Sequence, residues 1–201
     1  MITIENLCKA YNDKILFKNF HLKIPDSSFL VISGESGCGK STLLNMIGGI
    51  ENPDKGSIIV NGFDVAKKEK AEIFQRSCWI FISKFCPFGK QNSKRKSRNN
   101  KKSGRTDISI NEALEKVGLQ KVINKKVYQL SGGEQQRVAL ARLMLKKCSI
   151  VLADEPTGSL DKKNSEIVMN ILHELSEQGK TVIVVTHSEE IVAQEKHVLY
   201  L

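Results

Sequence analysis

One stretch, "SFLVISGESGCGKSTLL" at residues 28–44, constrains the fold of this chain more than any other. An apolar run leads into Gly34-x-x-x-x-Gly39-Lys40-Ser41, and apolar residues at helical spacing follow it. A buried strand that feeds a glycine-rich loop, which in turn opens a helix, is the context that a phosphate-binding loop requires. The alternative is a glycine-rich strand-to-helix turn that binds no ligand.

The loop predicts a site for ATP together with Mg²⁺. Backbone N–H groups of the loop and the N-terminus of the following helix attract phosphate oxygens. Lys40 is expected to reach the β- and γ-phosphates, and the Ser41 hydroxyl is expected to ligate Mg²⁺. The predicted ATP-binding residues of the loop are Gly34, Glu35, Ser36, Gly37, Cys38, Gly39, Lys40, Ser41 and Thr42.

Strands and helices alternate along the rest of the chain. Apolar runs predict buried strands at residues 149–154 and 181–187 and a last strand at 197–201, while period-two alternation predicts strands at 1–7 and 15–24. Helical spacing predicts helices at residues 40–50, 110–119, 134–145 and 164–178. This order predicts an α/β fold with a mostly parallel sheet and with ligands at the carboxyl ends of its strands.

Length and composition set wider limits. The 201 residues suffice for one α/β domain, and 40% hydrophobic with 26% charged residues is ordinary for a globular protein. No apolar run approaches the roughly 18 residues of a membrane helix, and the first residues do not resemble a signal peptide. The five cysteines show no paired metal spacing. We therefore expect a cytoplasmic protein whose membrane role, if any, comes through a partner.

The stretch "SIVLADEP" provides a second motif. Four apolar residues carry Asp154 to the end of a strand, where its carboxylate can hold Mg²⁺. Glu155 follows and can polarise an attacking water. An apolar run that ends in Asp-Glu is common by itself, so the assignment depends on the loop upstream.

The stretch "LSGGEQQR" at residues 130–137 resembles the motif that separates ABC ATPases from other phosphate-loop proteins. Nearly the whole chain resembles the nucleotide-binding subunit of an ABC transporter. That resemblance implies one domain over residues 1–201, with a P-loop NTPase core, an N-terminal antiparallel β subdomain and a helical subdomain at about 75–145. It also implies that Ser131, Gly132 and Gly133 contact ATP bound to the opposing subunit of a homodimer.

Smaller features occur at the spacing of that family. Asp161, in "SLD", resembles the loop that crosses the dimer interface, and His187 resembles the switch histidine that contacts the γ-phosphate. Tyr11 occupies the position where an aromatic ring stacks on adenine. Cys38 occupies a loop position that is usually serine in that family, and we expect its alkylation to block ATP binding.

The three motifs most resemble small subunits that serve bacteriocin, antimicrobial-peptide, lipoprotein-release and macrolide exporters. The resemblance implies ATP hydrolysis that powers export through a separate membrane permease, with this chain peripheral on the inner face of the membrane. An alternative is a transport-incompetent product, and a less favoured one is an ATPase associated with nucleic acid.

Residues 78–104 do not fit the family. Eight Lys or Arg lie within residues 90–105 without any Asp or Glu, so this segment contributes most of the formal +9 charge. Such a cluster can contact nucleic-acid phosphates. However, codons read one base later from Cys78 can spell "VGYLFQNFALLENKTVKEN", which restores the family's glutamine at the position of Ser83. We therefore expect an out-of-frame, disordered segment and no nucleic-acid partner, and sequencing of the gene tests this.

Overall fold

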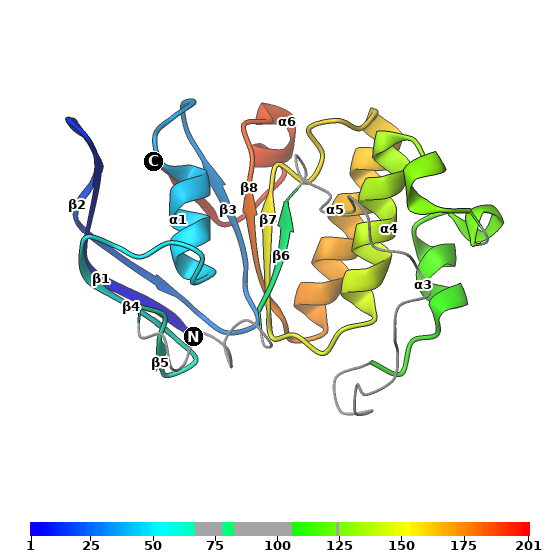
Figure 1. Ribbon diagram of the computed structural model, residues 1–201, viewed down its shortest axis with the longest axis horizontal. Helices are drawn as coiled ribbons and strands as arrows, with labels where there is room; N and C mark the ends of the chain where they lie inside the picture. The colour runs from blue at the N-terminus through cyan, green and yellow to red at the C-terminus, as the bar shows by residue number, and fades with distance from the viewer. Residues whose placement is uncertain (67–77, 83–105, 124) are drawn as a thin grey trace.

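The computed structural model describes residues 1–66, 106–123 and 125–201, together with the backbone of residues 78–82. The described parts form two sheets with helices between and beside them (Figure 1). The parallel sheet has the strand order β6-β7-β8-β3-β9, and the antiparallel sheet has the order β2-β1-β4-β5. The predicted mostly parallel sheet and N-terminal antiparallel subdomain are therefore confirmed.

The strands agree closely with the apolar patterns of the sequence. The antiparallel sheet comprises β1 (Ile2–Tyr11), β2 (Lys14–Ile24), β4 (Lys55–Val60) and β5 (Phe63–Asp64). The parallel sheet comprises β3 (Phe29–Ser33), β6 (Cys78–Ile82), β7 (Ile150–Asp154), β8 (Thr181–Val185) and β9 (Val198–Tyr200). Strand β8 is buried along its whole length, as expected of a central parallel strand that is covered on both faces.

The helices are α1 (Lys40–Ile47), α3 (Ile110–Lys116), α4 (Gly132–Met144), α5 (Lys162–Glu177) and α6 (Glu189–Val192), with short 3-10 turns η2 (Gln120–Val122) and η3 (Val127–Gln129). Helix α4 begins at Gly132 and not at Glu134, because Ser131 and Glu134 form a capping box. Each side chain of this pair bonds the backbone N–H of the other.

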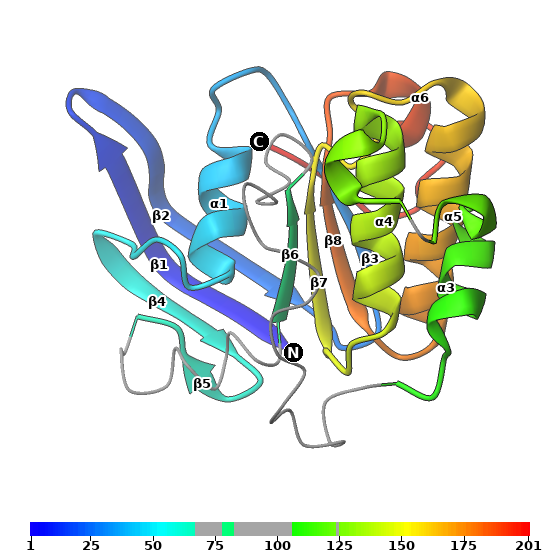
Figure 2. The same ribbon diagram turned by 45° about the vertical axis from the view of Figure 1, so that its right-hand side comes forward.

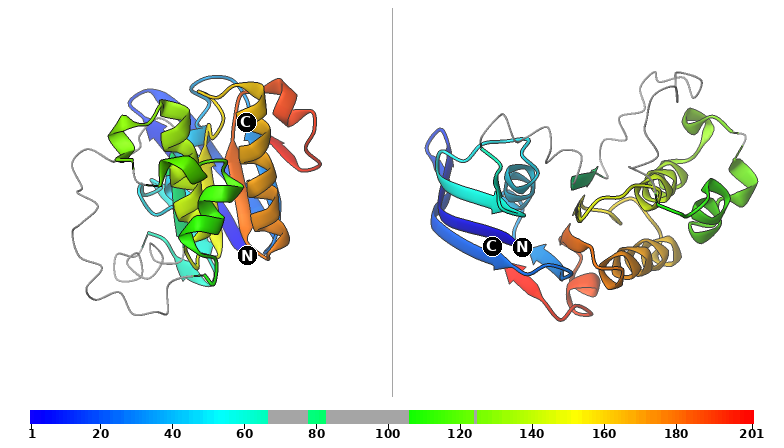
Figure 3. Two further views of the ribbon diagram at one scale, coloured as in Figure 1. Left: turned by 90° about the vertical axis from the view of Figure 1, so that its right-hand side faces the viewer. Right: turned by 90° about the horizontal axis from the view of Figure 1, so that it is seen from below.

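Two hydrophobic cores cover the two faces of the parallel sheet. Ile150 and Leu152 of β7 face α1 and the antiparallel sheet, while Val151 and Ala153 face α4 and α5. This alternation follows from the period of two along a strand. Figures 2 and 3 show the resulting layers, in which α1 lies between the two sheets and α4 and α5 cover the opposite face.

Strand β1 contains an irregularity that affects the site. Ile2 and Ile4 are buried, but beyond Asn6 the buried residues are Leu7 and Lys9. Asn6 has a φ of +50°, and the pairing of β1 with β2 shifts between Ile4 and Leu7. A bulge of this kind changes which side chains face the core.

Residues 78–82, the start of the suspected out-of-frame segment, pair in parallel with β7 from Cys78–Ile150 to Ile82–Asp154. The structure thus gives these five residues as strand β6, and the expectation of a disordered segment over residues 78–104 stays a prediction. Ser83 and the basic cluster at 90–105 lie outside the described residues. Among the residues that the structure describes, no helix is long and apolar enough to cross a membrane.

Candidate nucleotide-binding site

A cavity of about 800 Å³ lies at the carboxyl ends of strands β3, β7 and β8. The predicted site residues that line it are Tyr11, Gly34, Glu35, Ser36, Gly37, Gly39, Lys40, Ser41, Thr42, Asp154, Glu155 and His187. Cys38 is the one residue of the predicted loop that is not part of this lining. The structure therefore brings residues from four separate parts of the chain to one cavity.

The loop between β3 and α1 depends on glycine at two crowded positions. A Cβ atom on Gly34, whose φ is +144°, would lie 2.4 Å from the carbonyl oxygen of Leu201. A Cβ atom on Gly39, whose φ is +109°, would lie 3.0 Å from the ring of Phe17. Gly39 is also the N-cap of α1; it has no side chain to cap the helix, and no acidic residue lies in the first turn. An uncapped helix start of this kind suits an anion such as phosphate.

Lys40 is buried, and its ammonium group turns back onto the loop. Nζ donates to the carbonyl oxygen of Gly34 at 2.8 Å and to that of Glu35 at 2.7 Å. These bonds hold the loop in its wrapped shape while the charge stays at the cavity wall. A fixed cation beside the N-terminus of a helix fits a triphosphate.

Ser41 and Asp154 join the start of α1 to the end of β7. The hydroxyl Oγ of Ser41 donates to Oδ1 of Asp154 at 3.1 Å. Mg²⁺ takes oxygen ligands and is commonly held by one or two protein oxygens together with phosphates and water. This pair of oxygens beside a phosphate cradle fits such an ion.

Glu155 is held by the strand next to its own. Its backbone has a φ of +48°, an uncommon conformation for a residue other than glycine, and its N–H donates to the carbonyl oxygen of Val185 at 2.8 Å. Oε1 lies 2.6 Å from Nδ1 of His187, and Oε2 accepts from Oγ1 of Thr186 at 3.4 Å. The carboxylate is therefore oriented at the mouth of the cavity, in a position to act on water.

The structure places a second predicted group elsewhere. Ser131, Gly132 and Gly133 open α4 and do not line the cavity of their own chain. A Cβ atom on Gly133 would lie 2.9 Å from Cδ2 of Leu160, so the start of α4 packs closely against the loop before α5. Asp161 is the N-cap of α5 and accepts from the backbone N–H of Asn164 at 2.8 Å. These residues form one unit, separate from the cavity.

Arg137 and Asn164 connect the two helices of this unit. A guanidinium nitrogen of Arg137, on α4, donates to Oδ1 of Asn164 on α5. The amide Nδ2 of Asn164 in turn donates to Oδ2 of Asp161 at 2.8 Å. Arg137 of α4 and the N-cap of α5 are therefore linked by a chain of hydrogen bonds.

Sequence reasoning missed several residues of the site, among them Leu16 and Val185, which line the cavity. Lys14, at the start of β2, lines the cavity and donates from Nζ to the carbonyl oxygen of Gly37 at 2.9 Å. Thr186 is completely buried and bonds Glu155. No spacing marks Lys14, whereas Thr186 directly precedes His187 and could have been found as part of the same strand end.

Comparison with known proteins agrees with this geometry. The family model described as ABC transporter matches residues 17–158. The macrolide export ATP-binding/permease protein MacB of Campylobacter jejuni is 36% identical over an alignment of 217 positions, which covers 99% of this chain and 32% of that protein. The chain thus spans about a third of the length of such relatives. The ABC transporter ATP-binding protein MJ1508 of Methanocaldococcus jannaschii is 37% identical, with 100% of this chain and 95% of that protein covered.

A solved structure supports the same assignment. The dimeric post-hydrolysis state of the ATP-binding cassette MJ0796, bound to ADP and Pi, superposes with a TM-score of 0.79 and 32% identity. The match covers 100% of this chain and 94% of that one. The chain therefore belongs to the ABC transporter family and is an ABC ATPase domain.

Proposed function

We propose that this chain is a single domain that binds ATP with Mg²⁺ and hydrolyses it to power export through a separate membrane permease. The observation that carries the proposal is the convergence of the Ser41–Asp154 pair and the Glu155–His187 pair on one glycine-lined cavity. Bound Mg²⁺ would neutralise phosphate charge and bridge phosphate oxygens.

Each residue has a distinct role in this proposal. Ser41 and Asp154 hold the metal, and Lys40 exchanges its bonds to loop carbonyls for bonds to phosphate oxygens. Glu155 accepts a proton from the attacking water, because its carboxylate is already oriented by Thr186 and His187. His187 lies 74% exposed by side chain, so its ring can also contact the γ-phosphate.

The active form in this proposal is a homodimer. Ser131, Gly132, Gly133 and Asp161 lie apart from the cavity of their own chain, which supports a role toward ATP on the opposing copy. The MJ0796 cassette, which is similar over 94% of its chain, is described as dimeric. The uncapped α1 and the Ser131-capped α4 would then face the same triphosphate from two copies.

The permease is proposed as a separate partner. The MacB relative is named as both ATP-binding protein and permease, and this chain matches about a third of its length. The proposed cargo is a peptide, a bacteriocin, a lipoprotein or a macrolide-like molecule, and the chain would lie on the inner face of the cell membrane. No nucleic-acid partner is proposed.

Isothermal titration of the purified chain with ATP, with and without Mg²⁺, tests the nucleotide part of the proposal. We expect Mg²⁺-dependent binding that Lys40→Met weakens about tenfold to hundredfold, because a charge-assisted hydrogen bond to phosphate is lost. Lys55→Met, at an exposed position of β4, is the matched control and should bind as the wild type does. Binding that is independent of Mg²⁺, or equal in both variants, would reject the proposal.

A second candidate is an ATP-binding product that cannot transport, and the basic run at residues 90–105 favours it. Both candidates predict ATP binding, but only the first predicts transport. Reconstitution of the chain in vesicles with a candidate permease distinguishes them, since only the first candidate predicts ATP-driven export.

A further inference from the structure

Tyr11, at the end of β1, lies at the edge of the cavity with 46% of its surface exposed. A tyrosine on a free strand end would rotate among several positions, and that freedom would be lost when a base stacked on it. Here the phenol hydroxyl donates to Oε1 of Glu51, in the segment between α1 and β4. The ring is therefore tied to the part of the chain that follows the phosphate loop and its helix.

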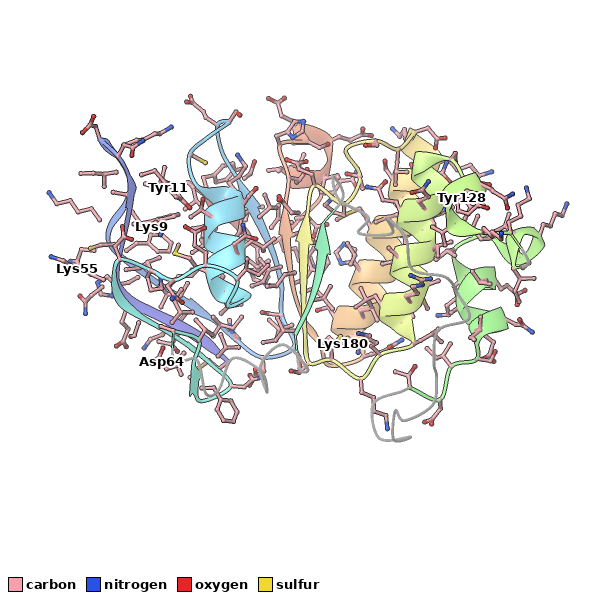
Figure 4. All side chains as sticks on the ribbon, in the orientation of Figure 1. Lys9, Tyr11, Lys55, Asp64, Tyr128 and Lys180 are labelled. Carbon is pink, nitrogen blue, oxygen red and sulfur yellow. The ribbon has the colours of Figure 1, made fainter. Side chains whose placement is uncertain are left out.

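Lys9 contacts the ring of Tyr11 as well. Residues two apart on a strand share a face, so Lys9 and Tyr11 both point from β1 to the same side. Nζ of Lys9 lies 5.1 Å from the centroid of the Tyr11 ring, within the range of a cation–π contact. Figure 4 labels both side chains in the region between β1 and α1.

The ammonium group of Lys9 is held by three acceptors in the segment between α1 and β4. Nζ lies 2.9 Å from Oε1 of Glu51, 3.2 Å from Oδ1 of Asp54 and 3.0 Å from the carbonyl oxygen of Asn52. Asp54 also accepts from the backbone N–H of Ala10 at 2.8 Å, through Oδ2. A lysine that is only 9% exposed is thus fully engaged, and it connects β1 to this segment.

The pKa values of Lys9 and Glu51 are shifted in the directions that favour an ion pair between them. The hydrogen bond to Glu51 raises the pKa of Lys9 above its ordinary value of 10.5, although burial opposes this. Burial would raise the pKa of Glu51, but the hydrogen bonds from Tyr11 and Lys9 lower it below 4.5. Near neutral pH, Lys9 is therefore a cation and Glu51 is a carboxylate that can accept from both neighbours.

We propose that Lys9 and Glu51 are positioning residues that fix the Tyr11 ring for stacking on the base of the bound nucleotide. Glu51 holds the hydroxyl end of the ring, and Lys9 occupies one side of it, which leaves the other side for the base. The inference rests on the proposed ATP site, because it requires a base above Tyr11. Unlike that proposal, it predicts variants that lose affinity for the base of the nucleotide and keep their affinity for the phosphates.

The experiment compares two ligands of the full-length chain by isothermal titration: ATP with Mg²⁺, and inorganic tripolyphosphate with Mg²⁺. Stacking of a base on an aromatic ring contributes about 1–3 kcal/mol, so Tyr11→Ala should weaken ATP binding about 5- to 150-fold. Lys9→Met and Glu51→Gln should each weaken it about fivefold to tenfold, as part of that contribution is lost. Tripolyphosphate, which has no base, should bind all variants as it binds the wild type.

Matched controls are available on the same sheet. Lys55→Met and Glu5→Gln make the same changes at exposed positions of β4 and β1, and both should leave the ratio of the two affinities unchanged. Tyr11→Phe keeps the ring but removes its bond to Glu51, so its loss should lie between those of the wild type and Tyr11→Ala.

A double variant separates positioning from general damage. If Lys9 acts through the ring, Lys9→Met should cause no further loss of ATP affinity when Tyr11 is already alanine. Three results would overturn the inference while leaving the ATP site intact. Lys9→Met could lower ATP affinity in the Tyr11→Ala background as much as it does in the wild type. It could weaken tripolyphosphate binding as much as ATP binding, or it could leave ATP affinity unchanged. A wild-type chain that bound neither ligand would instead overturn the proposed function, and this inference with it.

Discussion

Oε1 of Glu155 lies 2.6 Å from Nδ1 of His187, so the residue that follows β7 is paired with one that follows the adjacent strand β8. The backbone N–H of Glu155 also bonds Val185, the last residue of β8. The carboxylate therefore depends on the neighbouring strand for its position, and both of its oxygens have partners.

Glu155→Gln should keep ATP binding and lose most hydrolysis. The amide has nearly the same shape but cannot accept a proton, so the rate should fall about 10²- to 10⁴-fold, the scale typical of a lost general base. Phosphate release at saturating ATP measures the rate, and titration measures the affinity. Hydrolysis at the wild-type rate would mean that the base lies elsewhere.

Alkylation of Cys38 should block ATP binding. Its half-buried thiol lies 3.7 Å from Nζ of Lys40, inside the curve of the loop, so an added maleimide would displace the ammonium group. N-ethylmaleimide treatment followed by ATP titration tests this, with Cys38→Ser as the control that should bind ATP and resist the reagent. Labelling of Cys38, verified by mass spectrometry, without loss of affinity would contradict the prediction.

Asn164→Ala should destabilise the junction of α4 and α5. It removes the acceptor of Arg137, whose Nε is already without a partner among the described residues, so the free energy of unfolding should fall by about 1–3 kcal/mol. Asn170→Ala makes the same change at an exposed position of α5 and should cost no more than about 0.5 kcal/mol. Urea unfolding gives both values, and equal costs would show that the link contributes nothing.

The cost of Lys9→Met should depend on pH. The lowered pKa of Glu51 means that its paired carboxylate stabilises the folded chain above about pH 4.5, and that this contribution is lost as the pH falls below that value. Lys9 stays charged throughout this range because its pKa is raised. Lys9→Met should therefore destabilise the chain by about 1–3 kcal/mol at pH 7 and by less at pH 3. Denaturant unfolding at both pH values measures this, and a constant difference would contradict it.

The phosphate loop and the strand-end carboxylates could be predicted because their chemistry fixes both residue types and spacing. Lys40, Ser41, Asp154 and Glu155 all line one cavity, as expected. The start of α4 was predicted two residues too late, although the spacing of Ser131 and Glu134 is that of a capping box and could have marked it.

The supporting contacts could not be predicted in the same way. Lys9 meets Glu51 and Asp54 only because β1 and β4 pair in the folded chain, and no local pattern records that pairing. Lys14, at the start of β2, reaches Gly37 in the loop between β3 and α1, and no local pattern records that contact either. The suspected frame change over residues 78–104 stays a prediction, because only the sequence of the gene tests it.

The bulge at Asn6 decides which side of the sheet receives the ring of Tyr11. Counting in twos from Ile2 and Ile4 would place even-numbered side chains inward, yet Leu7 and Lys9 are the ones buried. One extra residue in the strand thus exchanges the inward-facing and outward-facing positions of the residues that follow it. Deleting that residue would leave the phosphate loop whole and move the ring of Tyr11, proposed here to stack on the base, to the other side of the sheet. The position of that ring therefore depends on a backbone count as much as on any side chain.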